Sequence, residues 1–258
     1  MNYQQTIRIN ARLNKQKIIS YLEHHYLNRK NGTARPRPIQ PLCLFCGSPI
    51  NITQEHVLPR WVFDRDPKRF FNSVINGLSH KYNQTTIPAC AECNNNLLSM
   101  LEKRLFYLFS TQFQNRKFFN DEEKADVIRW LELLDYKYQV FSLLTRFRAL
   151  KGKGSIPFLS DYSLSVLDSN VDYSPIKVMK NLRESIKRIS IKSKELQLNS
   201  LITFTTKNSD MHFFHKNNDF LFIELPRYNF ALLHFYKHTF IDELQAKDAA
   251  MDIIKLRY

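Results

Sequence analysis

Residues 43–61 read CLFCGSPINITQEHVLPRW and residues 90–96 read CAECNNN, and these two stretches decide the fold. They contain every cysteine of the chain, in two C-x-x-C pairs: Cys43 with Cys46, and Cys90 with Cys93. Two intervening residues allow a tight turn to direct both thiolates at one ion, and two such turns complete a tetrahedral site. The sequence therefore predicts a structural Zn²⁺ with four thiolate ligands and no open coordination position.

Disulfides and a redox pair are the competing interpretations of these cysteines. The N-terminus, MNYQQTIRIN, lacks the apolar segment of a secretory signal, which argues against disulfides. A redox C-x-x-C would not occur as two copies that use every cysteine. No apolar run approaches the roughly 20 residues of a membrane helix. We therefore expect zinc, no membrane partner and a cytoplasmic location.

The 43 residues between Cys46 and Cys90 contain Glu55 and His56, and Asn94 directly follows the last cysteine. A neutral histidine can take a proton from water near pH 7. A carboxylate and an amide oxygen are hard ligands that suit Mg²⁺. One metal ion can stabilise the charge that develops on a transferring phosphate. These three side chains are the parts of a site that hydrolyses phosphodiester bonds.

The order C-x-x-C, E-H-V-L-P and C-x-x-C-N resembles the HNH (ββα-metal) endonucleases, and more narrowly their subgroup braced by a four-cysteine zinc. The resemblance covers about residues 42–105 and implies an α+β protein in which a β-hairpin and a following helix enclose a catalytic ion. It implies that His56 is the general base and that Glu55 and Asn94 bind Mg²⁺ or Mn²⁺. The four cysteines match the zinc ligands of the subgroup.

Two features depart from the family pattern. The commoner dipeptide is Asp-His, and Glu55 is one methylene longer, which shifts the geometry of ion binding. The middle Asn of the family, which orients the histidine, has Asn83 as its best counterpart, with Asn76 and His80 as competitors.

Two further charged residues are candidates near the site. Arg60 follows Pro59 and is a candidate contact to the scissile phosphate. Glu102 lies in a Leu-Glu pair that similar bacterial proteins share, but its basic neighbours favour a position on a helix surface.

The rest of the chain divides into helical and strand-like segments. Hydrophobic spacing predicts helices over 10–29, 94–113, from about 120 to 150, 176–190 and 241–254. Asn120 and Glu123 form a capping box for the third helix, and the fourth has a basic face that includes Arg183 and Arg188. Short aromatic and β-branched runs over 201–207, 211–215, 219–225 and 229–236 predict an antiparallel meander. The expected domains are 1–41 (helix and basic proline-containing linker), 42–105 (nuclease) and 106–258 (target or partner recognition).

The charge of the chain favours a polyanionic partner. The 38 Lys and Arg exceed the 24 Asp and Glu, which gives a net charge of +14. A positive field concentrates phosphates and speeds their encounter with the protein. Most of the excess positive charge lies outside residues 41–120. The flanking segments are therefore expected to make many of the contacts with phosphate groups.

We expect the protein to be a metal-dependent endonuclease, which is a hydrolase of phosphodiester bonds, and to bind and cleave DNA. RNA is the alternative substrate, because such a core reads backbone geometry and not base sequence. A second hypothesis is a zinc-braced nucleic-acid-binding or adaptor protein without activity. A third is an anti-phage defence effector whose cutting is released by a protein partner subunit.

Overall fold

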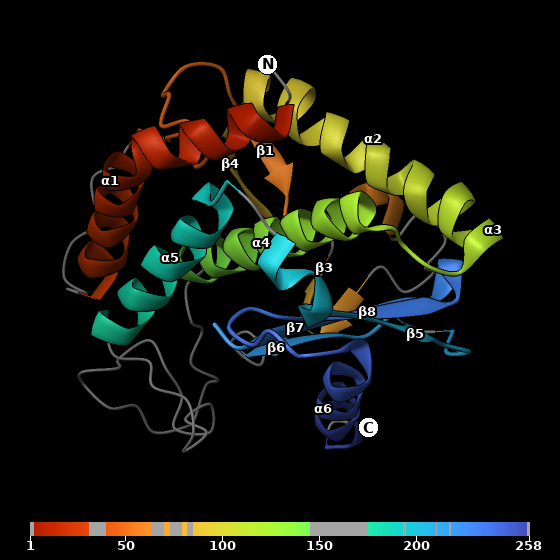
Figure 1. Cartoon of the computed structure of the whole chain (residues 1–258). Coiled ribbons are helices and arrows are strands. Elements are labelled where there is room, and N and C mark those ends of the chain that lie inside the picture. Colours follow the sequence, from red (N-terminus) through yellow and green to blue (C-terminus); the bar gives the residue numbers. More distant parts are fainter. Residues whose placement is uncertain are drawn as a thin grey trace.

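A computed structural model of the chain describes residues 3–30, 40–62, 70–72, 79–81, 85–144, 175–192, 195–209, 211–216 and 218–256. Runs of helices and runs of antiparallel strands follow one another along it, as expected for an α+β protein (Figure 1). Parts of the predicted basic linker, and most of the segment between the third and fourth predicted helices, lie outside the described residues.

Helix α4 (Asp121–Leu144) lies at the centre of the molecule. The predicted capping box is confirmed, because the Asn120 side chain accepts from the Glu123 N–H at 2.9 Å and Glu123 accepts from the Asn120 N–H at 3.0 Å. Every residue from Trp130 to Phe141 is buried. The sequence predicted one apolar stripe, whereas neighbours cover this helix on all sides, including its charged positions.

Two long helices pack on α4 and on each other. They are α1 (Tyr3–Lys30) and α5 (Pro175–Ser190). Lys177, Lys180, Arg183 and Lys187 of α5 are exposed, as the predicted basic face requires. Arg188 departs from that prediction, since it is buried and points into the core.

The largest sheet has four antiparallel strands in the order β5-β8-β7-β6. The strands are β5 (Leu201–Thr205), β6 (Phe213–Lys216), β7 (Phe220–Leu225) and β8 (Phe230–Phe235). Strands β6 to β8 form the expected meander, but the prediction was wrong for β5, which pairs with β8 and not with β6.

A buried carboxylate explains the position of β5. The chain from β5 to β6 passes the ends of β8 and β7. There the Thr206 N–H donates to the Asn229 carbonyl, and the Glu224 N–H donates to the His212 carbonyl. The Glu224 side chain accepts from Thr206, from Asn208 at 2.9 Å and from His212 at 2.6 Å. These bonds hold the crossover, and no short-range hydrophobic pattern encodes them.

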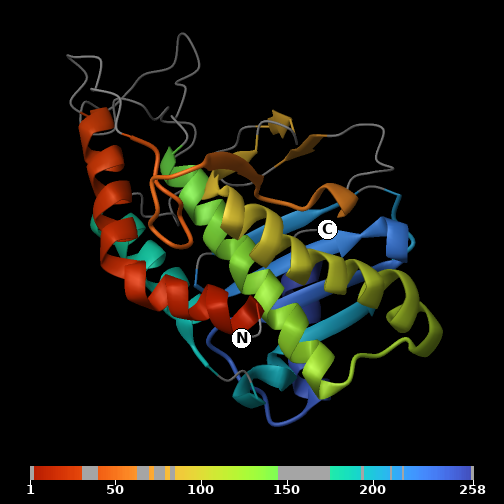
Figure 2. The same ribbon diagram turned by 90° about the horizontal axis from the view of Figure 1, so that it is seen from above.

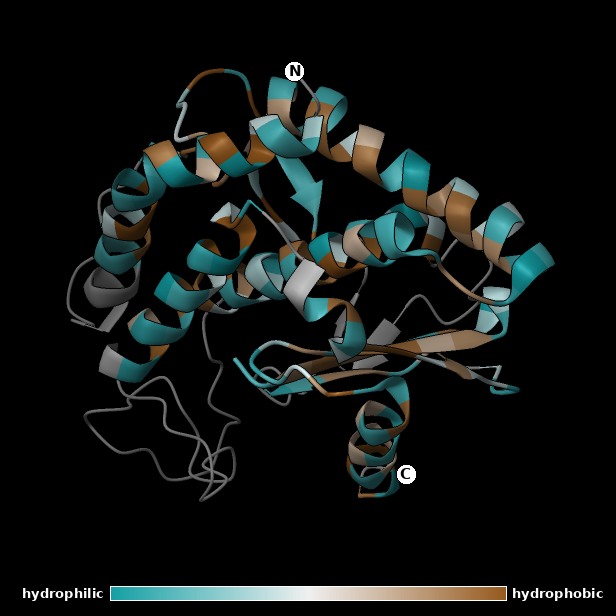
Figure 3. Cartoon of the chain, in the orientation of Figure 1, coloured by the Kyte–Doolittle hydropathy of each residue, from teal (hydrophilic) through white to brown (hydrophobic). Residues whose placement is uncertain are grey.

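Both faces of this sheet are covered, so its strands are hydrophobic almost throughout (Figure 3). One face packs on the core around α4, through side chains such as Leu221 and Leu232. The other packs on α6 (Glu243–Lys255), through Ala246 and Ala250. Figure 1 shows α4 and α6 on opposite sides of the strands. The expectation that the many phenylalanines form core is confirmed.

A two-stranded antiparallel sheet lies on the other side of α4 and leads into a long helix. It consists of β1 (Ile52–His56) and β4 (Thr86–Cys90). The helix starts after β4 with π-wound turns (Glu92–Leu98) and continues as α2 (Ser99–Tyr107). A second π-wound stretch (Leu108–Gln112) and α3 (Phe113–Arg116) complete it. Figure 2 shows α2 beside α4, both lying across the large sheet.

A second strand pair and three short helical turns complete the described elements. The pair is β2 (Phe70–Asn72) with β3 (Ser79–Lys81), and the 3₁₀ turns are Arg60–Val62, Glu195–Ser200 and Pro226–Tyr228. One core cluster includes residues from all three expected domains, such as Ile18, Val57 and Tyr236. The division at 41 and 105 stays a prediction about sequence units, which share this core. No helix within the described ranges is long and apolar enough to cross a bilayer.

Candidate functional site

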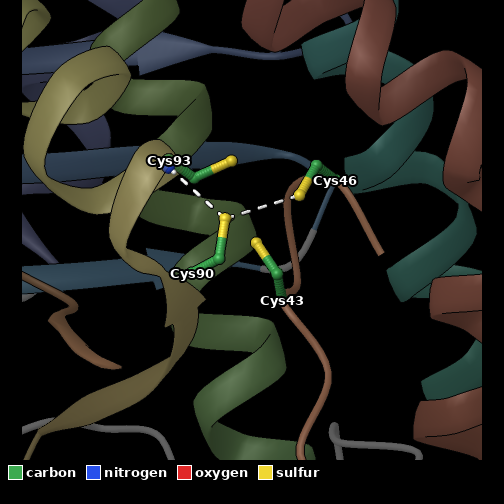
Figure 4. A group of neighbouring side chains, drawn as sticks. All are labelled: Cys43, Cys46, Cys90 and Cys93. Carbon is green, nitrogen blue, oxygen red and sulfur yellow. Dashed lines mark hydrogen bonds between the residues drawn. The ribbon is translucent and has the colours of Figure 1, made fainter. Parts of the chain in front are cut away.

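The four cysteines gather at the base of β1 and β4, as the sequence predicted (Figure 4). All four are free thiols, and their sulfur atoms lie within 4.8 Å of one another. The Cys46 and Cys90 sulfurs are 3.6 Å apart. Four thiolates around one zinc at Zn–S distances near 2.3 Å have sulfurs about 3.8 Å apart. The cluster can therefore hold a metal ion such as Zn²⁺.

The first cysteine pair is fixed by a tight turn that needs glycine. Gly47 has φ +68°, and its N–H donates to the Cys43 carbonyl at 2.8 Å. A Cβ at Gly47 would lie 3.1 Å from the Asn14 side chain of α1. Positive φ and a close neighbour together favour glycine at this position. The turn is tied to α4 by Tyr136, whose hydroxyl donates to the Leu44 carbonyl.

The electrostatics of the thiols fit a cation. A hydrogen bond from Cys93, as the largest cause, lowers the pKa of Cys43 to about 5. Burial first, and then the neighbouring thiols, raise the pKa of Cys46 to about 12. Ionisation of one thiol thus makes ionisation of the others less favourable, because neighbouring thiolates repel one another. A bound divalent cation would offset this repulsion.

Strand β1 ends in Glu55 and His56, and the helix after β4 places Asn94 beside it. Glu55 pairs in register with Ile87, and His56 with Thr86. The Asn94 amide donates to Thr53 Oγ1 at 2.9 Å and to the Gln54 carbonyl at 3.2 Å. Thr53 and Glu55 are two residues apart, so both project from the same face of the strand. The structure thus brings Asn94 to the Glu55 face of β1.

The carboxylate of Glu55 is buried and bonded to Lys137 of α4. Glu55 is 5% exposed, and the Lys137 side chain is 3% exposed. Lys137 Nζ donates to Glu55 Oε1, to the His56 carbonyl at 3.2 Å and to Glu102 Oε1 at 3.4 Å. An ammonium group has three donors, and here three acceptors face it. We call Glu55, Glu102 and Lys137 the hairpin charge cluster.

Glu102 is not the solvated helix-surface residue that its basic neighbours favoured. It projects from α2 toward Lys137, and burial, as the largest cause, raises the pKa of its carboxyl to about 7. Sequence reasoning missed Lys137 entirely. Its only signal was a lysine within the apolar pattern of the third predicted helix, at a position that a neighbouring carboxylate must balance.

His56 is half-buried and lies on the opposite face of β1 from Glu55 by strand alternation. Burial, as the largest cause, lowers its pKa; Lys137 and Arg60 lower it further, and Glu55 opposes them. His56 is therefore neutral near pH 7, which is the form a general base requires.

The remaining sequence candidates divide in two. Arg60 is exposed and begins the 3₁₀ turn after β1, close enough to His56 to affect its pKa. Asn83 lies outside the described residues, and the side chains of Asn76 and His80 do too. Trp61, in the same turn as Arg60, stacks on Trp130 with ring centroids 5.7 Å apart and packs the turn on the core.

The donor types fit a hard divalent ion. Glu55 offers a carboxylate, and among the described residues the Asn94 Oδ1 accepts no hydrogen bond. Lys137 holds one oxygen of Glu55 and is therefore the one group that competes with such an ion. Within the described ranges, clusters of three or more His, Cys, Asp or Glu ligands are limited to the four cysteines.

A second buried charge cluster lies on the other side of α4, two residues before Lys137. Asp135 accepts from Arg188 of α5, from Gln139 at 2.8 Å and from His215 of β6 at 3.4 Å. Arg188 also donates to Asn218 at 2.6 Å and lies 4.3 Å from the centroid of the Tyr236 ring. We call this group, centred on Asp135 and Arg188, the sheet charge cluster.

Comparisons with known proteins add no further constraint on this site. No protein-family model, curated protein or solved structure matches the chain.

Proposed function

We propose that the chain is a metal-dependent endonuclease of the HNH type that hydrolyses phosphodiester bonds, with DNA as its preferred substrate. His56 is the general base, and Glu55 and Asn94 hold one Mg²⁺ or Mn²⁺. The four cysteines hold a structural zinc that keeps β1, β4 and the following helix together.

The observation that carries the proposal is the position of Asn94. Its amide bonds to β1 at Thr53 and Gln54, immediately before the Glu55-His56 pair. Residues 40 and 41 positions apart in sequence are thereby joined in a strand–strand–helix unit, in the order that the resemblance implies. The cysteines fix both ends of that unit.

The roles of the side chains follow from their chemistry. Neutral His56 takes a proton from the attacking water, and its lowered pKa keeps it in the unprotonated form that can accept that proton. A bound Mg²⁺ or Mn²⁺ would stabilise the charge that develops on the phosphate oxygens. The exposed guanidinium of Arg60 lies near His56 and can orient a phosphate by paired hydrogen bonds.

A plasmid-nicking assay with Mg²⁺ tests this function. We expect the wild type to nick supercoiled DNA, EDTA to stop it, and His56→Ala to reduce the rate by about 10²–10⁴-fold, the usual contribution of a general base. His238→Ala is the matched control, because the His238 side chain is 62% exposed and lies after β8. Equal nicking by wild type and His56→Ala would reject the proposal. Structured and single-stranded RNA in the same assay test the alternative substrate.

One observation favours a second candidate, a nucleic-acid-binding protein without activity. Lys137 bonds the Glu55 carboxylate in the interior, where it neutralises a proposed metal ligand. Binding of DNA that weakens steeply with salt, without cleavage in Mg²⁺ or Mn²⁺, would support this candidate.

A protein partner that releases the activity, as in an anti-phage defence effector, stays a hypothesis. Copurification of a second protein from the native operon would support it, and strong activity of the isolated chain would oppose it.

A further inference from the structure

The hairpin charge cluster contains a single cationic side chain, that of Lys137. Two carboxylates, Glu55 and Glu102, share the single ammonium of Lys137. They come from different elements, β1 and α2, while Lys137 comes from α4. In the interior, an uncompensated charge is far more costly than at the surface. Lys137 is therefore the cation that an ion binding at Glu55 would meet.

The two charge clusters on α4 differ in this respect. Asp135 faces the Arg188 guanidinium, the Gln139 amide and the His215 ring. The Glu55 carboxylate instead has one oxygen bonded to Lys137 and lies on the same strand face as Asn94, whose amide oxygen accepts no bond among the described residues. Lys137 thus occupies one side of the group of oxygen atoms that the proposed ion would use.

We propose that Lys137 is a positioning residue that holds Glu55 and Glu102 when no divalent ion is bound, and that an ion binding at Glu55 displaces its ammonium. This inference rests on the proposed function. The ammonium and the ion are both positively charged and bind the same carboxylate, so they compete for it.

Binding of Mn²⁺ to the zinc-loaded protein, measured by calorimetry, tests the inference. We expect Lys137→Met to bind Mn²⁺ at least about tenfold more tightly than wild type, because a competing cation is removed. Lys103→Met, the same change at an exposed lysine of α2, should bind as wild type does. Equal or weaker binding by Lys137→Met would overturn the inference.

Glu55→Gln separates this inference from the proposed function. Loss of Mn²⁺ binding in Glu55→Gln, with unchanged binding in Lys137→Met, would keep the metal site and reject the role of Lys137. No binding that depends on Glu55 in any variant would reject both.

A measurement on the wild type covers the case in which Lys137→Met does not fold. Amine acylation followed by mass spectrometry should label Lys137 slowly without Mn²⁺, because its side chain is 3% exposed. With Mn²⁺, labelling of Lys137 should increase severalfold, while that of Lys103 should not change. Unchanged labelling of Lys137 at saturating Mn²⁺ would overturn the inference.

Discussion

The hairpin and sheet charge clusters lie on opposite faces of one helix, yet their composition differs. The sheet cluster pairs one carboxylate with one guanidinium, and neutral amides and a histidine complete its surroundings. The hairpin cluster places two carboxyl groups beside one ammonium, and one of them belongs to Glu55, the residue before His56. The sheet cluster has the contacts of a structural charge pair, whereas the hairpin cluster contains the carboxylate that we propose as a metal ligand. Both clusters are buried, so burial of charge alone does not distinguish a functional site from a structural one.

Loss of the four-cysteine metal site should give the largest difference between the two sides of α4. Cys90→Ser breaks the four-thiolate set, and structural zinc sites contribute on the order of 10 kcal/mol in small domains. We expect β1 and β4 to lose amide-exchange protection while β7 and β8 retain most of theirs, because the sheet is covered independently by α6. Hydrogen–deuterium exchange with mass spectrometry measures this. Equal loss in both sheets would show that the cysteine cluster supports the whole core.

Arg188→Met should give the next largest effect, on the sheet cluster. It leaves Asp135, which is fully buried, without its guanidinium, and such changes cost about 3–5 kcal/mol. Urea unfolding at pH 7 measures the loss. Lys187→Met is the control, since Lys187 is exposed on the same helix and should change stability by less than about 0.5 kcal/mol. A similar small effect of both variants would contradict a structural role for this pair.

Glu102→Gln should change how stability depends on pH. The folded-state pKa of Glu102 is about 7, against an ordinary value of 4.5. Between these values the folded protein holds a proton that the unfolded chain has released, so its stability falls as pH rises, by at most about 1.4 kcal/mol per pH unit. The variant should lack this fall when urea unfolding is measured from pH 4.5 to 7 without added Mg²⁺. The control Glu122→Gln, at a side chain that is 84% exposed, should retain it.

Arg60→Gln should give the smallest effect, on the pH dependence of the DNA cleavage that we propose. The positive charge of Arg60 lowers the pKa of His56, although burial contributes more. Its removal should raise that pKa, so the acidic limb of the rate profile should move to higher pH while the rate on the plateau falls modestly. The shift should shrink at high salt, because exposed charges are screened. A shift in the opposite direction would exclude this electrostatic coupling.

Much of the fold was predictable from local patterns. The capping box at Asn120, the four-cysteine cluster and the separate runs of helices and strands all depend on residues that are close in sequence or strongly constrained by chemistry. The edge position of β5 was not predictable, because it depends on Glu224 bonding to a loop that precedes it by many residues.

The candidate site was predictable in part for the same reason. Glu55, His56 and Asn94 stand out beside the cysteines, and the structure brings Asn94 to β1. Lys137 is 82 residues from Glu55 and has no recognisable motif, and Arg188 was indistinguishable from its exposed neighbours on α5. Charged residues that are paired across the core become visible only when the helices are docked.

The central position of α4 has a consequence for how the protein is made. A ribosome releases the N-terminal segment first, at about 5–20 residues per second. All four cysteines therefore leave it before α4, so zinc can bind while Glu55 still lacks Lys137 and the Leu44 carbonyl still lacks Tyr136. During that interval Glu55 faces solvent, and it becomes buried only when α4 docks. The order of synthesis thus allows a metal ion to bind the cysteines before the candidate active site closes.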